Sequence, residues 1–187
     1  MFTKIRYNSP VVLTFVIICF VILGLNNFIG NWLMYNFFCV YRFSLTDILG
    51  YVRLFTHVLG HADLSHCISN MTLILVLGPM LEEKYGSKIL LESIAITALV
   101  SGILHCLVSS GALLGASGIV FMMIMMASLG GMERGTIPLT MILVAIIYIG
   151  GEIVDGILNQ DSISQLTHII GGICGTVIGM GLGKKRG

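Results

Sequence analysis

Residues 115–132 read GASGIVFMMIMMASLGGM and contain no aspartate, glutamate, lysine or arginine. An uncharged helix of this length covers most of the roughly 30 Å of hydrocarbon in a bilayer. Soluble domains carry about 25% charged residues, whereas this chain of 187 residues carries 10% and is 56% hydrophobic, with a mean hydropathy of +0.99. The sequence therefore predicts a multi-pass membrane protein and excludes a disordered chain.

Five further apolar runs have a similar length and composition. The predicted spans cover about 10–29, 64–81, 89–113, 115–132, 137–154 and 165–183. We expect a single all-α membrane domain over 1–187, a six-transmembrane-helix bundle whose first span is retained and not cleaved as a signal peptide. The one long gap, residues 30–63, is aromatic-rich and mixed in polarity, which is typical of a structured element at the membrane interface.

The distribution of basic residues predicts the orientation. With six spans, one side of the membrane holds Lys4, Arg6, Lys84, Lys88, Arg134, Lys184, Lys185 and Arg186, and the other side holds Arg42 and Arg53. The positive-inside rule then places both termini in the cytoplasm (N-in, C-in), and we expect the plasma membrane. Because the net charge is +1 and no basic stripe exists outside the chain ends, no nucleic-acid partner is expected.

Polar residues fall at one depth of three predicted spans that run in the same direction. His66 and Asn70 lie in the first two turns of the second span, Ser117 begins the fourth, and His168 is in the first turn of the sixth. All lie within about 10 Å of the outer ends of their helices. Polar groups in hydrocarbon are costly and are functional candidates. This set suits nucleophilic chemistry, with Ser117 attacking, a neutral imidazole taking its proton, and His66 and Asn70 stabilising an oxyanion.

Simpler explanations compete with this interpretation. A Gly-Ala-Ser-Gly sequence in a membrane helix is common at helix-packing surfaces. His57, His61 and His66 are spaced as metal ligands can be, but only Asp63 or Cys67 could complete a ligand set with them, so we expect no metal. The five cysteines form no CxxC pair and favour small buried hydrophobes over a disulfide framework.

The last predicted span carries a stripe of glycines. They recur every four residues, at Gly171, Gly175, Gly179 and Gly183. Such a stripe allows close contact with a neighbouring helix. The natural neighbour is the span 115–132, because packing there would bring His168 against Ser117.

Four motifs occur together in one order along the chain. They are Arg53-x-Phe55-Thr56-His57-x3-His61-x4-His66-x3-Asn70, Glu82-Glu83-Lys84-Tyr85-Gly86-Ser87, Gly115-Ala116-Ser117-Gly118 and His168-x2-Gly171-x3-Gly175. In these motifs the sequence resembles a rhomboid intramembrane serine protease, over most of the chain from about residue 53 to residue 183. Six spans with short tails resemble the minimal bacterial form of that family.

The resemblance implies a serine endopeptidase that works by a Ser117–His168 dyad, without an aspartate and without a cofactor. His66 and Asn70 match the pair that stabilises the oxyanion. The implied substrates are single-span transmembrane proteins in the same lipid bilayer, which are cleaved in or near their membrane-spanning helices.

Further positions match or depart from the family pattern. Gly115 matches the glycine that precedes the nucleophile, and His61 matches a supporting polar position; residues 30–63 match a membrane-embedded first loop. Phe121 stands where the family often has a tyrosine that stacks on the catalytic histidine, so the stacking is kept and a hydroxyl is lost. Val52 stands in place of the tryptophan in a Trp-Arg pair.

Two other functions remain as alternatives. One is a non-catalytic rhomboid-like protein that binds and escorts membrane clients, although this chain keeps both the serine and the histidine. The other is a transporter that uses the polar cluster as a proton or ion relay. The cluster opens to one side of the membrane, whereas alternating access requires a site near the midplane.

Overall fold

The computed structural model describes residues 6–129 and 162–184, with isolated positions between these ranges. Its elements are α1 (Pro10–Ile29), α2 (Trp32–Phe37), α3 (Ile48–Thr56), the 3-10 turn η1 (His57–Leu59), α4 (Leu64–Tyr85), α5 (Ser87–Val108), α6 (Ser117–Ser128) and α8 (Ser162–Lys184). Within those ranges there is no strand, and extended backbone pairs only at an isolated bridge between Val40 and Leu113. The all-α prediction is confirmed.

Four of the described helices are long and apolar enough to cross a membrane. They are α1, α4, α5 and residues Gln165–Leu182 of α8, while α6 is apolar but shorter. In a bilayer such helices satisfy all their backbone hydrogen bonds internally, so the chain is a helical membrane protein. The predicted span 137–154 lies outside the described residues, apart from isolated positions.

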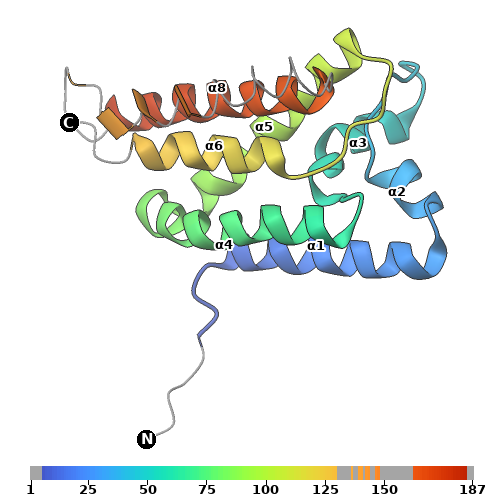
Figure 1. The fold of residues 1–187 in the computed structure, drawn as a ribbon, viewed down its shortest axis with the longest axis horizontal. Coiled ribbons are helices and arrows are strands. Elements are labelled where there is room, and N and C mark those ends of the chain that lie inside the picture. Colours follow the sequence, from blue (N-terminus) through green and yellow to red (C-terminus); the bar gives the residue numbers. More distant parts are fainter. Residues whose placement is uncertain are drawn as a thin grey trace, which may run out of the picture.

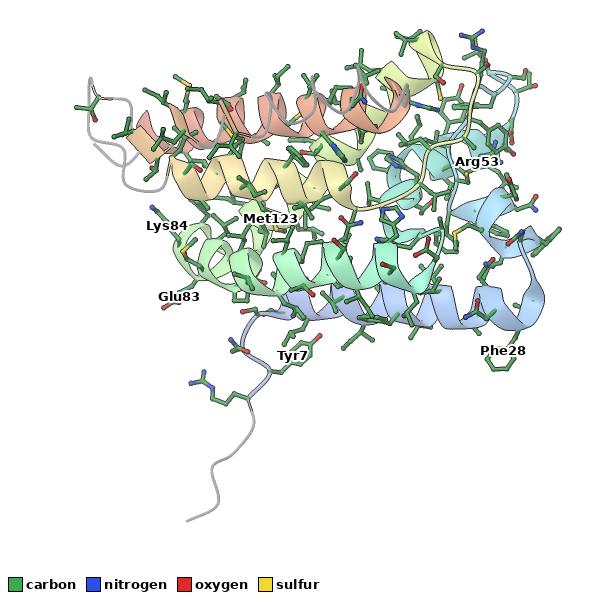
Figure 2. The ribbon with its side chains drawn as sticks, in the orientation of Figure 1. Tyr7, Phe28, Arg53, Glu83, Lys84 and Met123 are labelled. Carbon is green, nitrogen blue, oxygen red and sulfur yellow. The ribbon has the colours of Figure 1, made fainter. Side chains whose placement is uncertain are left out.

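The helices form a bundle in which α1 lies beside α4 and α6 lies beside α8, with α5 behind them (Figure 1). The first loop, residues 30–63 with α2, α3 and η1, covers the end of the bundle at which α4, α6 and α8 begin. Methionines fill much of the core, and Figure 2 shows Met123 pointing from α6 toward α4. Met71, Met122 and Met126 are buried with it.

Local signals explain where several helices begin and end. Pro10 occupies the first position of α1, where its missing N–H costs nothing. Asp63 precedes α4 and accepts a hydrogen bond from the backbone N–H of His66 at 2.8 Å. Gly30 and Gly86 follow α1 and α4 with φ of 81° and 88°, which residues with side chains rarely adopt.

A buried carboxylate ties α1 to the turn between α4 and α5. Glu82 accepts hydrogen bonds from the backbone N–H groups of Val11 at 3.0 Å and Val12 at 3.1 Å, and from the Ser87 hydroxyl at 2.7 Å. The first N–H groups of a helix have no partner within the helix. Glu82 therefore caps α1 from another helix and holds its start in place.

One or both ends of α4, α5, α6 and α8 differ by one to five residues from the limits of the predicted spans. α5 ends at Val108, five residues before the predicted span 89–113 does. The chain then folds back, so that Leu113 and Val40 exchange backbone hydrogen bonds of 2.8 and 2.9 Å. α6 begins two residues after the start of the predicted span 115–132. Gly115 has a φ of 123°, which no helix accommodates, so α6 begins at Ser117.

Candidate active site

A cavity of about 340 Å³ lies among α4, α6, α8 and the residues that precede α6. Its walls include His66 and Asn70 of α4, Ser117 of α6 and His168 of α8, the four residues that the sequence analysis connected with catalysis. Sequence reasoning missed its apolar walls, which are Leu73, Leu113, Leu114 and Val120. Leu113 and Leu114 reach the cavity only because the chain folds back after α5, and this fold-back has no local sequence signal.

Glycines set the distance between α6 and α8. A Cβ atom on Gly171 would overlap the backbone carbonyl of Gly118, and one on Gly175 would overlap that of Met122. Farther along, Gly179 faces Leu129. The predicted contact between the glycine stripe and this helix is confirmed, and the order of the pairs shows that α6 and α8 run parallel. The two helices therefore present their first turns, with Ser117 and His168, at the same end.

The ring of His168 is held by an aromatic neighbour. Phe121, one turn after Ser117 on α6, stacks on the imidazole with a centroid distance of 4.4 Å and an interplanar angle of 7°. Both rings line the cavity. Stacking of this kind fixes the plane of the imidazole. The phenylalanine that departs from the family's frequent tyrosine thus keeps the stacking contact.

The residues before α6 approach α4 closely. Gly115 has a φ of 123°, and a Cβ atom there would lie 2.8 Å from Cε1 of His66. Its backbone N–H donates to the carbonyl of His57 at 3.0 Å. Glycine is therefore required at position 115 for both its conformation and its clearance. Ser117, two residues later, is the first residue of α6, where the helix dipole favours negative charge.

Asn70 supplies a hydrogen-bond donor to the cavity. Its side chain is 6% exposed, and its Nδ2 group has no hydrogen-bond partner among the described residues. A buried donor without a partner is costly, by about 1–3 kcal/mol. A ligand oxygen within hydrogen-bond distance of Nδ2 would satisfy this donor.

His57 and His61 lie outside the spanning helices and do not line the cavity. Nε2 of His57 is 3.1 Å from the Ala98 carbonyl, and the ring of His61 meets that of His66 edge-on at 5.1 Å. Burial lowers the pKa of both imidazoles to about 4, and for His61 the neighbouring His66 lowers the pKa further. Both rings are therefore neutral near pH 7. They lie next to the site, where His61 contacts the ring of His66 and the carbonyl of His57 accepts from the N–H of Gly115.

Arg53 of α3 organises the first loop at the end of the bundle (Figure 2). Its guanidinium is buried, pairs with the carboxylate of Asp47 at 2.6 Å and lies 4.4 Å from the ring centre of Tyr41. Sequence reasoning missed both partners, although an aspartate just before the apolar start of α3 is an N-cap signal. Val52 is 42% exposed on the surface of α3.

The site suits acid–base and nucleophilic chemistry by its own side chains. Within the described part of the chain, no three His, Cys, Asp or Glu side chains gather closely enough to hold a metal ion. The cavity instead combines the two hydroxyls of Ser69 and Ser117 with two imidazoles and one amide. A hydroxyl beside a neutral imidazole can become a nucleophile, and amide and imidazole N–H groups can hold an oxyanion.

Comparisons with known proteins agree with this architecture. Residues 49–185 match the Rhomboid domain, which covers more than half of the chain and includes α4, α5, α6 and α8. A comparison with curated proteins found no match. The family match and the helical membrane bundle lead to one conclusion: the chain belongs to the rhomboid family.

Proposed function

We propose that this rhomboid is an intramembrane serine endopeptidase that hydrolyses peptide bonds in or near the transmembrane helices of other membrane proteins. One observation carries the proposal: Ser117, His168, His66 and Asn70 come from three helices and line one cavity. Polar groups that persist at this depth of a membrane helix are functional by default. A non-catalytic family member has no need of a serine and a stacked histidine in the same cavity.

In the proposed reaction, Ser117 is the nucleophile and His168 the general base. The imidazole of His168 accepts the hydroxyl proton while Oγ of Ser117 attacks the scissile carbonyl carbon. The C–N bond then breaks, and His168 returns the proton to the leaving amine. Water attacks the resulting ester by the same route in reverse, which releases the acid product and restores the serine.

His66 and Asn70 stabilise the negative charge of the tetrahedral intermediate in this proposal. They lie one turn apart on α4, so both side chains project from the same face into the cavity. The buried Nδ2 group of Asn70 is a donor already free of other partners in the described structure. Loss of one such donor costs about 100- to 1000-fold in rate, so His66→Ala and Asn70→Ala should each leave measurable cleavage.

The proposed orientation is N-in and C-in, in the plasma membrane. The start of α1 packs on the end of α4, while α4, α6 and α8 run in one direction, so the chain enters and leaves the bundle at the same end (Figure 1). Among the described residues, that end carries Arg6, Lys84, Lys88 and Lys184, whereas Arg42 and Arg53 lie in the first loop at the other end, which supports the positive-inside assignment. The site then faces the outer side, and the substrates are single-span proteins that unwind near that surface.

A fluorophosphonate probe tests the nucleophile directly. We expect the probe to label the wild type and not Ser117→Ala. Ser128→Ala is the matched control, because Ser128 lies on the same helix and donates its hydroxyl to the Ile124 carbonyl at 2.8 Å, away from the cavity. Ser128→Ala should label like the wild type.

Cleavage of a single-span membrane protein with an extracytoplasmic N-terminus completes the test. Ser117→Ala and His168→Ala should each abolish cleavage, because the two side chains act as a unit. Labelling of Ser117→Ala at the wild-type level would contradict the assignment of the nucleophile. A folded wild type that neither labels nor cleaves would favour the non-catalytic alternative.

A further inference from the structure

A second cavity, an apolar groove of about 570 Å³, lies between α1, α5 and the first loop. It shares no residue with the cavity that contains Ser117. Ile18 of α1, Phe55 of α3 and Leu91 of α5 line the groove and are 38%, 45% and 56% exposed. The groove therefore opens sideways, toward the hydrocarbon that surrounds the bundle.

The groove has the depth of one leaflet. Its walls run from Pro10 to Ile18 on α1 and from Ser87 to Ala98 on α5. At 1.5 Å per residue these stretches measure roughly 12 to 16 Å. The hydrocarbon core is about 30 Å thick, so the groove reaches from the membrane surface to about the midplane. Its size and apolar walls suit an acyl chain, not a polar ligand.

A polar cavity of about 580 Å³ adjoins the surface end of the groove. The two share Pro10 and Ser87 as lining residues. The polar cavity is also lined by one cation, Arg6, and by two carboxylates, Glu82 and Glu83. Glu82 already accepts hydrogen bonds from α1 and Ser87, whereas neither Arg6 nor Glu83 belongs to the ion pairs found among the described residues. Figure 2 shows Glu83 at the same end of the bundle as Tyr7, the neighbour of Arg6.

We propose that the groove and the polar cavity together bind one phospholipid with a zwitterionic headgroup. One of the two acyl chains lies in the groove, the phosphate pairs with the guanidinium of Arg6, and an ammonium pairs with the carboxylate of Glu83. Charge complementarity selects this class of lipid, because a headgroup with only negative charge would face Glu83 unpaired. Phe55 at the inner end of the groove places the first loop in contact with the chain.

Photo-crosslinking tests the position of the chain. The full-length protein is reconstituted in bilayer discs with phosphatidylethanolamine that carries a diazirine midway along one acyl chain, and cross-linked peptides are identified by mass spectrometry. We expect labels on residues 10–18 and 87–98, and competition by unlabelled phosphatidylethanolamine. Labels spread evenly over all exposed helix faces would overturn the proposal.

A matched pair of variants separates the groove from the general lipid surface. Ala95→Phe fills the groove and should lower labelling about tenfold, which corresponds to about 1.4 kcal/mol. Ile96→Phe places the same side chain one residue later, at a position that is 48% exposed and outside the groove, and should leave labelling unchanged. Equal labelling of both variants at the wild-type level would overturn the proposal. Thermal unfolding of each variant separates lost binding from lost folding.

The headgroup is tested by charge. Arg6→Gln and Glu83→Gln should each weaken labelling by phosphatidylethanolamine about tenfold. Lys88→Gln, which removes a cation that lines neither cavity, should have no effect. A phosphatidylglycerol probe should label the wild type less than phosphatidylethanolamine does. Equal labelling by both lipids, unaffected by Arg6 and Glu83, would overturn the headgroup assignment. Binding is measured without proteolysis, so the result stands apart from the proposed activity.

Discussion

The α6–α8 contact and the first loop both border the candidate site, but they are held by different forces. Between α6 and α8, backbone meets backbone, as Gly171 lies against the carbonyl of Gly118. In the first loop, polar groups make the contacts: Arg53 pairs with Asp47, and the carbonyl of His57 accepts from the N–H of Gly115. The helix pair depends on shape, and the loop depends on hydrogen bonds and charge.

The surroundings explain this difference. Inside the hydrocarbon, lipid tails are as apolar as leucine side chains, so helices gain by close packing and not by hiding from the solvent. Near the interface, a chain that leaves the helical conformation needs partners for its exposed N–H and C=O groups. Substitutions between α6 and α8 should therefore cause large losses of stability. Substitutions in the first loop should cause smaller losses that depend on pH and salt.

The largest effect is expected from Gly171→Ala. A Cβ atom at this position meets the rigid backbone of Gly118, so α6 and α8 must separate. Overpacking of this kind costs about 3 kcal/mol. Thermal unfolding in detergent should show the loss of stability, together with lost fluorophosphonate labelling. Gly172→Ala is the control, because its Cβ atom would lie an ordinary 3.8 Å from Met125. Equal unfolding temperatures for the two variants would contradict the claim that close packing at Gly171 stabilises the contact between α6 and α8.

A smaller effect, of about 2 kcal/mol, is expected from Gly115→Ala, because alanine is strained at a φ of 123°. Gly86→Ala is the matched variant, since Gly86 has a φ of 88° but open space around its Cα. Both variants should lose stability, and only Gly115→Ala should displace His66 and slow cleavage. Unfolding temperature and cleavage rate are measured on the same samples. If Gly86→Ala slowed cleavage equally, strain alone would explain the result.

Acid should weaken the first loop through His57. Its pKa is about 4 in the folded chain because of burial, against an ordinary value of 6.5. As the pH falls below 6.5, His57 is protonated in the unfolded chain but stays neutral in the folded chain. The free energy of unfolding therefore falls. Between pH 7 and pH 5.5 this loss is about 1 kcal/mol. The stability that this neutral histidine contributes is fully present above pH 6.5.

Unfolding temperatures at pH 8, 7 and 5.5 measure this effect. His57→Asn should show a smaller fall between pH 7 and pH 5.5 than the wild type, and no difference in slope between pH 7 and pH 8. His61→Asn should behave similarly, because burial also lowers the pKa of His61 to about 4. A wild type whose stability is constant down to pH 5.5 would contradict the neutral, buried state of both rings.

The smallest effect is expected from Asp47→Asn. Asparagine can still accept the N-cap hydrogen bond from Leu49, so the change removes only the charge opposite Arg53. Because the Asp47 side chain is 36% exposed, water already weakens this pair. We expect a slight fall in unfolding temperature that added salt diminishes. Asp63→Asn, at another N-cap aspartate, should cause no such salt-dependent change.

The sequence predicted features that depend on neighbouring residues. The predicted span 10–29 has the bounds of α1, which begins at Pro10 and is followed by Gly30. The stripe that begins with Gly171 and Gly175 was predicted to contact the helix of Ser117, since a repeat of four residues keeps one face smooth. The roles of Ser117 and His168 in catalysis stay predictions.

Features that depend on distant residues were not predictable. The end of α5 at Val108 depends on the pairing of Leu113 with Val40, and an apolar segment gives no local sign of such a partner. The clearance between Gly115 and His66 follows from how α4 and the segment before α6 approach each other. The apolar groove likewise needs the first loop to return against α1 and α5.

The contact of Glu82 with α1 has a consequence for how the protein assembles. The N–H groups of Val11 and Val12 find their acceptor more than 70 residues later, since the bonds join positions 71 and 70 residues apart. During synthesis α1 therefore enters the membrane with an open first turn, which closes only when the α4–α5 hairpin arrives. The hydrogen bonds at the start of α1 therefore form only after α4 and α5 have been inserted beside it. The buried carboxylate of Glu82 thus couples completion of the first helix to assembly of the first half of the bundle.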